Sequence, residues 1–329
     1  MPRNAGDLKA TLNEIDGRGY KSYKRIAGRW EFDDYTISVD HVQGDPFAAP
    51  SAVSAEIQLA RTGLPAWALV DASAVAATRD YLARVFADSA KRIARGRRGS
   101  GKGGLIEIDA PGQEILERSA VTIRGRTLTV RFFVGLPAHG RRVAGRDAVE
   151  MLNRELPQIL SATLFYSGDS HSELKRHVES VQDATALREE LASRNWIAFV
   201  ADGSILPRAS GVDPRPMAPD RSVPFTSPPA FRHSVTLPNR GTVTGMAIEP
   251  GVTLVCGGGY HGKSTLLDAI STGIYDHVPG DGRELVATTF GAVKIRAEDG
   301  RRVARVSIDP FISNLPYGRD TRAFESEDA

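Results

Sequence analysis

The chain has 329 residues, of which 41% are hydrophobic and 25% charged, values that are typical of a folded globular protein long enough for two domains. No apolar run approaches the roughly 18 residues of a membrane span, and the polar start MPRNAGDLKATLNEID is unlike a signal peptide, so we expect a cytoplasmic protein with no membrane partner. The net charge is only +2, and the single cysteine, Cys256, cannot form an internal disulfide.

The first two thirds of the chain mix helical and strand patterns. Leu8, Leu12 and Ile15 recur at helical spacing and predict a helix within residues 1–16. Alternation in WEFDDYTISVD, residues 30–40, predicts a half-buried strand. Further predicted elements are helices over 75–95, 145–162 and 173–194, a hairpin over 121–136 that turns at Gly125, and a short buried strand over 196–203. We therefore expect an α+β region over residues 1–206, either as one unit or as two subdomains divided near residue 105.

Basic residues concentrate in the first 150 positions, although the whole chain is nearly neutral. The stretches 17–30, 89–106 and 118–146 carry lysines and arginines without one acidic residue. Such runs are typical either of a solvated surface balanced by acids elsewhere or of a surface that binds nucleic acid. Under the second interpretation the partner is RNA or single-stranded DNA, and the candidate phosphate contacts are Lys21, Lys24, Arg25, Arg97, Arg98 and Lys102. The interleaved aromatic residues, which could stack on bases, are Tyr20, Tyr23 and Trp30.

One basic stretch imitates a phosphate-binding loop. GRRGSGKGG, residues 96–104, has the spacing G-x-x-x-x-G-K, but Gly103 replaces the serine or threonine that would hold magnesium. A predicted helix precedes it and the strand-like LIEID follows it, which is the reverse of the order that a nucleotide site needs. We therefore expect a flexible basic loop here and no second nucleotide site.

A proline-rich segment separates the chain into two predicted parts. Residues 207–229 contain seven prolines in 23 positions, and each lacks an amide donor, so neither a regular helix nor a central strand can form. We interpret this segment as the linker between domains; a long ordered surface loop is the alternative.

The strongest motif follows that linker. GVTLVC, residues 251–256, predicts a buried parallel strand, and it leads into GGGYHGKS and the helical start STLLDAIS. This satisfies G-x-x-x-x-G-K-[ST] between a strand and a helix, which predicts a site for ATP or ADP with Mg²⁺. Lys263 would contact the β- and γ-phosphates and Ser264 would ligate Mg²⁺. The predicted nucleotide-binding residues are Gly257, Gly258, Gly259, Tyr260, His261, Gly262, Lys263, Ser264 and Thr265. A glycine-rich turn that happens to precede a helix is the alternative.

The residues that hydrolysis also requires are harder to find. An acidic residue at the end of another buried strand must hold magnesium, and Asp309 in VARVSIDP is the downstream candidate. Because no glutamate neighbours Asp309 and Pro310 follows it, a turn-starting role is favoured. DHVPGDGRE, residues 276–284, contains His277 and three acids, but its glycines and proline favour a surface loop over a metal cluster.

Several segments together resemble a family of predicted ATPases of the ABC class that are not transporter subunits. In the second half these are GVTLVCGGGYHGKSTLL, YDHVPGDGRE, VKIRAEDGR and DPFISNLPYGRDT. In the first half they include IDGRGYKSYK, DHVQGDPFAAPS, GSGKGGLIEIDAPGQEILER, FFVGLPAHGRR and FVADGSILPRASGVDPRP, in the family's order. The resemblance implies that residues 257–264 are a Walker A loop, that the basic N-terminal region binds nucleic acid, and that an aromatic residue upstream, for which we select Phe231, stacks on adenine.

The family's signature segment and its Walker B strand ending in Asp-Glu are not recognisable in this sequence. In the family the signature of one protomer completes the site of another, which implies a homodimer for a full-length chain. We therefore expect an α/β protein, with an α+β N-terminal region followed by a C-terminally incomplete ABC-type P-loop nucleotide-binding domain over residues 230–329. Two functions remain open: an ABC-class ATP hydrolase whose N-terminal region binds RNA, or a nucleotide-binding chain that does not turn ATP over.

Overall fold

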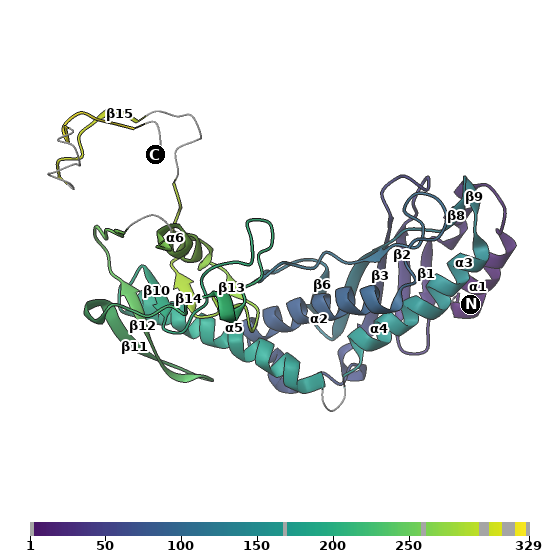
Figure 1. Ribbon diagram of the computed structural model, residues 1–329. Helices are drawn as coiled ribbons and strands as arrows, with labels where there is room; N and C mark the ends of the chain where they lie inside the picture. The colour runs from purple at the N-terminus through teal and green to yellow at the C-terminus, as the bar shows by residue number, and fades with distance from the viewer. Residues whose placement is uncertain (1–2, 167–169, 258–260, 296–302, 311–319, 327–329) are drawn as a thin grey trace. The chain divides into compact units, whose positions relative to one another are not determined.

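The computed structural model describes residues 3–166, 170–257, 261–295, 303–310 and 320–326 (Figure 1). The chain divides into two units, Met1–Thr289 and Phe290–Ala329, and each is described by itself. Among the helices of the described residues, none combines the length and the apolar character that crossing a bilayer requires.

A six-stranded antiparallel sheet forms the centre of the N-terminal region. Its path runs β1 (Gly28–Glu31), β2 (Thr36–His41), β3 (Ser51–Gln58), β7 (Thr127–Val134) and β4 (Ile106–Glu107), and β6 (Val121–Arg124) also pairs with β7. The hairpin expected at Gly125 is confirmed as β6 and β7. The single strand expected over residues 30–40 is wrong: β1 and β2 pair with each other. Asp33 and Asp34 lie between them, and aspartate favours turns because its side chain competes for local backbone hydrogen bonds.

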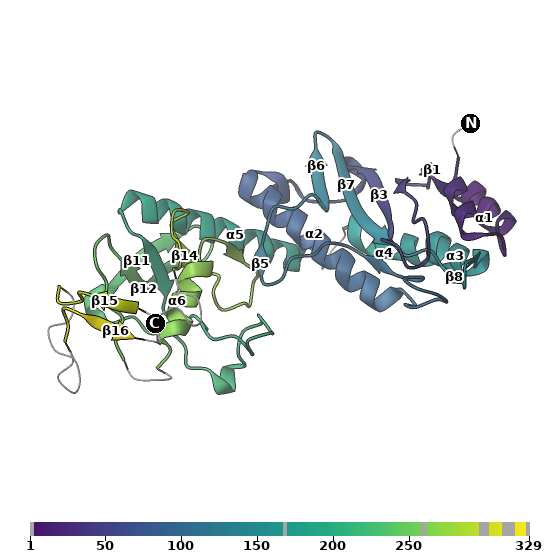
Figure 2. The same ribbon diagram turned by 90° about the horizontal axis from the view of Figure 1, so that it is seen from above.

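Helices cover one face of this sheet, as Figures 1 and 2 show for α2 and α4. The helices of the region are α1 (Ala5–Glu14), α2 (Ala72–Ile93), α3 (Gly145–Glu150), α4 (Leu156–Leu164) and α5 (Ser170–Ser193), with a π-helical turn, Met151–Glu155, between α3 and α4. Asp71 caps α2 by accepting the amide of Ala74 at 2.7 Å. The helices predicted from apolar periodicity are therefore confirmed.

The core between sheet and helices follows from the alternation of β3 and β7. Val53 and Ile57 of β3, and Leu128 and Phe132 of β7, are buried on the covered side. The Phe132 ring packs against Phe86 of α2, with centroids 4.9 Å apart. Apolar burial of this kind is the main stabilising contribution to such a layer.

A second antiparallel sheet carries the residues that precede and follow the glycine-rich motif. Its order is β11 (Arg232–Leu237), β12 (Gly241–Ile248), β10 (Ala198–Ala201) and β14 (Val286–Thr288). Leu187 and Leu191 from the C-terminal half of α5 lie in its core with Trp196 and Phe199, whereas Leu174 from the N-terminal half of α5 lies in the first core. Helix α5 therefore contributes to both hydrophobic cores.

The remaining elements are short. In the first unit they are the strand pairs β5 (Glu114–Ile115) with β13 (Asp276–His277) and β8 (Ala138–His139) with β9 (Arg142–Val143), the helix α6 (Lys263–Thr272), and the 3-10 turns Tyr20–Ile26, Leu59–Arg61, Ala66–Leu69, Pro219–Arg221 and Pro229–Phe231. In the second unit β15 (Val303–Val306) pairs with β16 (Phe324–Ser326). The proline-rich segment 207–229 contains no helix longer than a 3-10 turn, as its composition predicts.

Candidate functional site

Helix α6 begins at the lysine of the glycine-rich motif, in agreement with the helix predicted there. Gly262 precedes it in the left-handed conformation, with φ 83°, which a residue with a side chain adopts only at a cost. Lys263 is the first helical residue, and its Nζ donates to the carbonyl oxygen of Gly257 at 2.7 Å.

The other motif residues differ in exposure. His261 and Ser264 are exposed, and Thr265 is half-buried. Gly258, Gly259 and Tyr260 lie outside the described residues. An exposed Ser264 in the first turn is accessible to a metal ion held by a bound nucleotide, and the unpaired amides of a helix N-terminus attract anionic groups.

Helix α6 is fixed to the second sheet by its buried side. Ala269 packs in a small apolar cluster with Val200 and Val286. The Thr288 hydroxyl of β14 donates to the carbonyl oxygen of Ile270 at 2.7 Å, and the amide of Thr288 donates to that of Gly273 at 3.0 Å. Helix α6, which follows the glycine-rich motif, therefore has a defined position against the second sheet.

The strand predicted before the loop is absent, so that prediction is wrong. Residues 251–257 form no strand and are exposed throughout; Val252 and Leu254 retain 80% and 66% of their surface. An apolar run becomes a central parallel strand only where neighbouring strands pair with it, and every strand pair among the described residues is antiparallel and formed by other segments.

A pocket of about 480 Å³ lies beside α6. Thr265 and Asp268 of the helix line it, together with Arg208 and Arg283. Arg283 is buried and donates to the carbonyl oxygen of Leu206, and burial, followed by the nearby charge of Arg208, lowers its pKa to about 10. Asp268 also lines the pocket and Asp281 pairs with Arg208, so the positive charge of the two guanidinium groups beside the motif is offset in part by carboxylates.

The segment 276–284 is not the surface loop that its composition suggested. His277 and Asp281 are buried, and the Arg208 Nη1 atom lies 2.6 Å from an Asp281 carboxylate oxygen. Arg188 of α5 pairs with Asp276. The segment is therefore a buried connection between α5, the proline-rich segment and the second sheet. No group of three metal-ligating side chains occurs among the described residues.

The remaining nucleotide candidates are on the surface or in the second unit. Phe231 is 51% exposed in a 3-10 turn, where a stacking partner could reach it. Asp309 belongs to the second unit and accepts hydrogen bonds from Thr321 and from Arg322. Both partners are side chains 12 and 13 residues later in the chain, so these contacts do not test the turn-starting role favoured from the sequence.

The basic segments of the N-terminal region converge at one set of loops. The Tyr20 amide donates to the carbonyl oxygen of Arg141 at 2.9 Å, and the Ser100 amide donates to that of Ala138 at 2.7 Å. The Lys102 amide donates to the carbonyl oxygen of Pro46 at 2.9 Å. We call residues 17–21, 43–48, 97–104 and 138–142 the basic loop cluster.

Exposed cations occupy this cluster. Lys21, Arg97 and Lys102 are exposed, and the ion pairs of the described residues include none of them. Lys24 is also exposed, whereas Arg25 forms a two-pronged ion pair with Glu14 at 2.7 and 2.6 Å. The loop 97–104 has defined hydrogen bonds, including the Arg98 amide to the Gly103 carbonyl at 2.7 Å, where a flexible loop was expected.

Arg98 does not have the position expected of a phosphate contact. It is 4% exposed, and its guanidinium pairs with Glu155, itself 7% exposed. The Nε and Nη1 atoms of Arg98 have no hydrogen-bond partner among the described residues. The Arg98 guanidinium is therefore buried in an ion pair, whereas the side chain of its neighbour Arg97 is exposed to solvent.

The aromatic residues proposed for base stacking are buried, so that prediction is wrong. Tyr20, Tyr23 and Trp30 are 4%, 0% and 0% exposed. The Tyr23 hydroxyl donates to the carbonyl oxygen of Pro137 at 2.6 Å, which fastens the basic segment to the neighbouring loop. Phe47, which no pattern in the sequence singles out, is 69% exposed within the basic loop cluster.

Two family descriptions match the sequence. The first, "ATPase of the ABC class N-terminal", covers residues 5–167, and the second, the P-loop domain of ABC ATPases, covers residues 170–329. The boundary between the two matches lies before α5, and the expected linker 207–229 lies inside the second match. A comparison with curated proteins finds no match.

Proposed function

Because the chain belongs to the ABC class of ATPases, outside the transporters, we propose that it binds ATP with Mg²⁺ through residues 257–265 and RNA through its basic loop cluster. The observation that supports nucleotide binding is the start of α6 at Lys263, directly after Gly262 in the left-handed conformation. That geometry presents the N-terminus of a helix, with its partial positive charge, and a lysine to the same space.

The residues fit a magnesium nucleotide in their chemistry. Lys263 would exchange its bond to the Gly257 carbonyl for the phosphates, and the Ser264 hydroxyl would hold the metal ion. Magnesium, when bound, neutralises phosphate charge. The Arg283 guanidinium, which donates to the Leu206 carbonyl, would add positive potential beside Thr265, whereas that of Arg208 is offset by its ion pair with Asp281.

We propose that this chain holds the nucleotide without turning it over. Phosphoryl transfer requires a carboxylate for the metal and a group that orients water, in addition to the phosphate loop. Near the pocket of α6, Asp281 is buried and paired with Arg208. Asp309 has its own local partners in the second unit. Neither is poised for that role.

Measured affinities for nucleotides test the proposed binding of ATP with Mg²⁺. Titration of ATP and ADP with Mg²⁺ should show saturable binding to the wild type and at least tenfold weaker binding to Lys263→Ala. Lys175→Ala, which removes an exposed lysine of α5, is the matched control and should bind as the wild type does. Equal affinities for the wild type and Lys263→Ala would refute the site.

The proposed binding of RNA depends on three exposed cationic side chains in the hydrogen-bonded loops of the basic loop cluster. Each phosphate contact to a single strand contributes about 0.7 to the logarithmic salt slope of binding, because counterions are released. Replacing Lys21, Arg97 and Lys102 together by alanine should lower that slope by about 2. Binding that does not change with salt, or that the triple variant leaves unaltered, would contradict an RNA-binding surface.

A further inference from the structure

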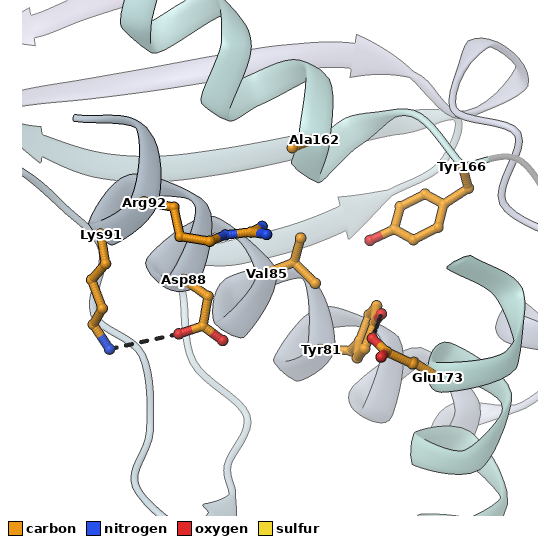
Figure 3. Close-up of a pocket in the computed structure, with 8 residues that line it drawn as sticks. All are labelled: Tyr81, Val85, Asp88, Lys91, Arg92, Ala162, Tyr166 and Glu173. Atoms are coloured by element: carbon orange, nitrogen blue, oxygen red, sulfur yellow. Dashed lines mark hydrogen bonds and ion pairs between the residues drawn. The ribbon is translucent and has the colours of Figure 1, made fainter. Parts of the chain in front are cut away.

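A pocket of about 590 Å³ lies between α2, the end of α4 and the start of α5, and none of its lining residues belongs to the P-loop motif (Figure 3). Its volume falls in the range of sites for small organic molecules. Two tyrosine rings, Tyr81 and Tyr166, form part of its wall, with centroids 6.4 Å apart. Val85 and Ala162 add apolar surface.

Tyr166 is the unusual member of this wall. Its side chain is 7% exposed, and its hydroxyl has no hydrogen-bond partner among the described residues. Figure 3 shows that hydroxyl pointing into the pocket. Burial raises the pKa of Tyr166, so the hydroxyl stays protonated and remains a donor. A buried donor without an acceptor costs free energy unless something supplies one.

The position of Tyr166 is fixed, so the side chain cannot relieve this cost by moving with its backbone. The Tyr166 amide donates to the carbonyl oxygen of Thr62 at 2.8 Å. Gly63 lies so close to the Tyr166 carbonyl that a Cβ atom there would collide with it. Arg92, whose guanidinium points into the same pocket in Figure 3, is exposed and can change rotamer to admit a ligand.

The charges of the pocket balance. Lys91 pairs with Asp88 at 3.6 Å, and Glu173 accepts the hydroxyl of Tyr81 at 3.2 Å. With Arg92, the lining carries two cations and two carboxylates. A free phosphate or a polyphosphate would meet as much repulsion as attraction here. A neutral planar ligand that both accepts and donates hydrogen bonds meets complementary groups and aromatic walls instead.

We propose that this pocket binds a nucleobase that carries a carbonyl beside an N–H group, as guanine does. The carbonyl accepts from the Tyr166 hydroxyl and the Arg92 guanidinium, and the N–H groups donate to the Glu173 carboxylate. Adenine can accept from the Tyr166 hydroxyl through a ring nitrogen, but it then presents a single amino group to the Glu173 carboxylate, where guanine presents a ring N–H and an amino group. A site whose polar groups are all paired by one base discriminates against a base that pairs fewer of them.

Guanosine is the probe that tests the pocket, with the whole chain and no ATP present. We expect saturable binding of guanosine at submillimolar concentration and at least tenfold weaker binding of adenosine. Tyr166→Phe removes only the unpaired hydroxyl, so it should weaken guanosine binding about tenfold and leave the melting temperature of the ligand-free chain equal or higher. A structural role for the hydroxyl would instead lower that temperature.

Arg92→Ala is a second variant on an exposed residue, and Arg95→Ala, beyond the end of α2 and outside the pocket lining, is its control. The base could belong to a free nucleoside or to an RNA strand. A second measurement therefore uses an RNA oligonucleotide that contains one guanosine among adenosines. If Tyr166→Phe and Arg92→Ala both weaken the binding of guanosine, the pocket is a site for a free nucleoside. If they weaken only the binding of the oligonucleotide, the pocket holds a base of a bound RNA strand. Unchanged binding of both ligands by both variants overturns the proposal.

Discussion

Replacing Arg98 by methionine should destabilise the N-terminal region far more than any change at its neighbour Arg97. Arg98 and Glu155 are 4% and 7% exposed and pair with each other. Removing one partner of a buried pair leaves an uncompensated charge and costs about 3–5 kcal/mol. Because 1 kcal/mol shifts the melting temperature of a region of this size by about 2–4 °C, we expect a decrease of roughly 6–20 °C.

Thermal and urea unfolding, followed by circular dichroism, measure this effect. Arg97→Ala is the matched control, because an exposed surface substitution changes the free energy of unfolding by about 0.5 kcal/mol or less. The double variant Arg98→Met with Glu155→Met removes both charges and should recover most of the loss, since apolar replacement of a whole buried pair is often neutral. That recovery separates the lost charge partner from lost packing.

Two results would refute the reasoning. One is an Arg98→Met variant as stable as the wild type; the other is a double variant whose loss equals the sum of the single losses, which would mean that the two residues do not interact. The same variants also separate folding from RNA binding. Arg97→Ala should weaken RNA binding with no change in stability, whereas the folded fraction of Arg98→Met should bind RNA normally.

Three further predictions concern the two proposed surfaces. Steady-state phosphate release by the chain should equal background, and turnover abolished by both Lys263→Ala and Asp309→Ala would contradict this. Phe47→Ala should weaken RNA binding by about 5–150-fold, which corresponds to the loss of one stacked base at about 1–3 kcal/mol, without changing the salt slope; an unchanged affinity in filter binding would remove Phe47 from the surface. Gly262→Ala should weaken MgATP binding, since a side chain at φ 83° costs about 1–2 kcal/mol, and calorimetry that finds wild-type affinity would contradict this strain.

The helices could be predicted from the sequence, because a helix that is buried on one side carries apolar residues at three- and four-residue spacing. The same periodicity is present among the aromatic residues of the first basic stretch, residues 17–30, and it indicates burial. Tyr20, Tyr23, Ile26 and Trp30 recur at three- and four-residue spacing, and all four are buried. Their basic neighbours suggested stacking on bases. The exposed aromatic Phe47 lies between prolines, where no periodicity distinguishes it from a buried residue.

Other features depend on partners far away in the sequence and could not be predicted locally. Arg98 is buried by Glu155, 57 residues later, which no pattern in GRRGSGKGG indicates. The converse holds for residues 251–256, whose composition is that of a central strand but which are not paired in the structure. The motif Gly262-Lys263-Ser264 did predict where α6 begins, since a glycine with positive φ before a lysine is a local requirement.

Helix α5 provides the physical connection between the two family regions. Its 24 residues form one helix about 36 Å long, at about 1.5 Å per residue. Glu173 near its start lines the proposed nucleobase pocket, and Arg188 near its end pairs with Asp276 and donates to the Gly273 carbonyl, the residue directly after α6. Helix α5 therefore lines the pocket and also contacts the residue that follows α6, the helix proposed to bind phosphate. Since linkage between two sites needs a shared element whose position each ligand affects, α5 is where substitutions such as Arg188→Ala would reveal any dependence of MgATP binding on guanosine.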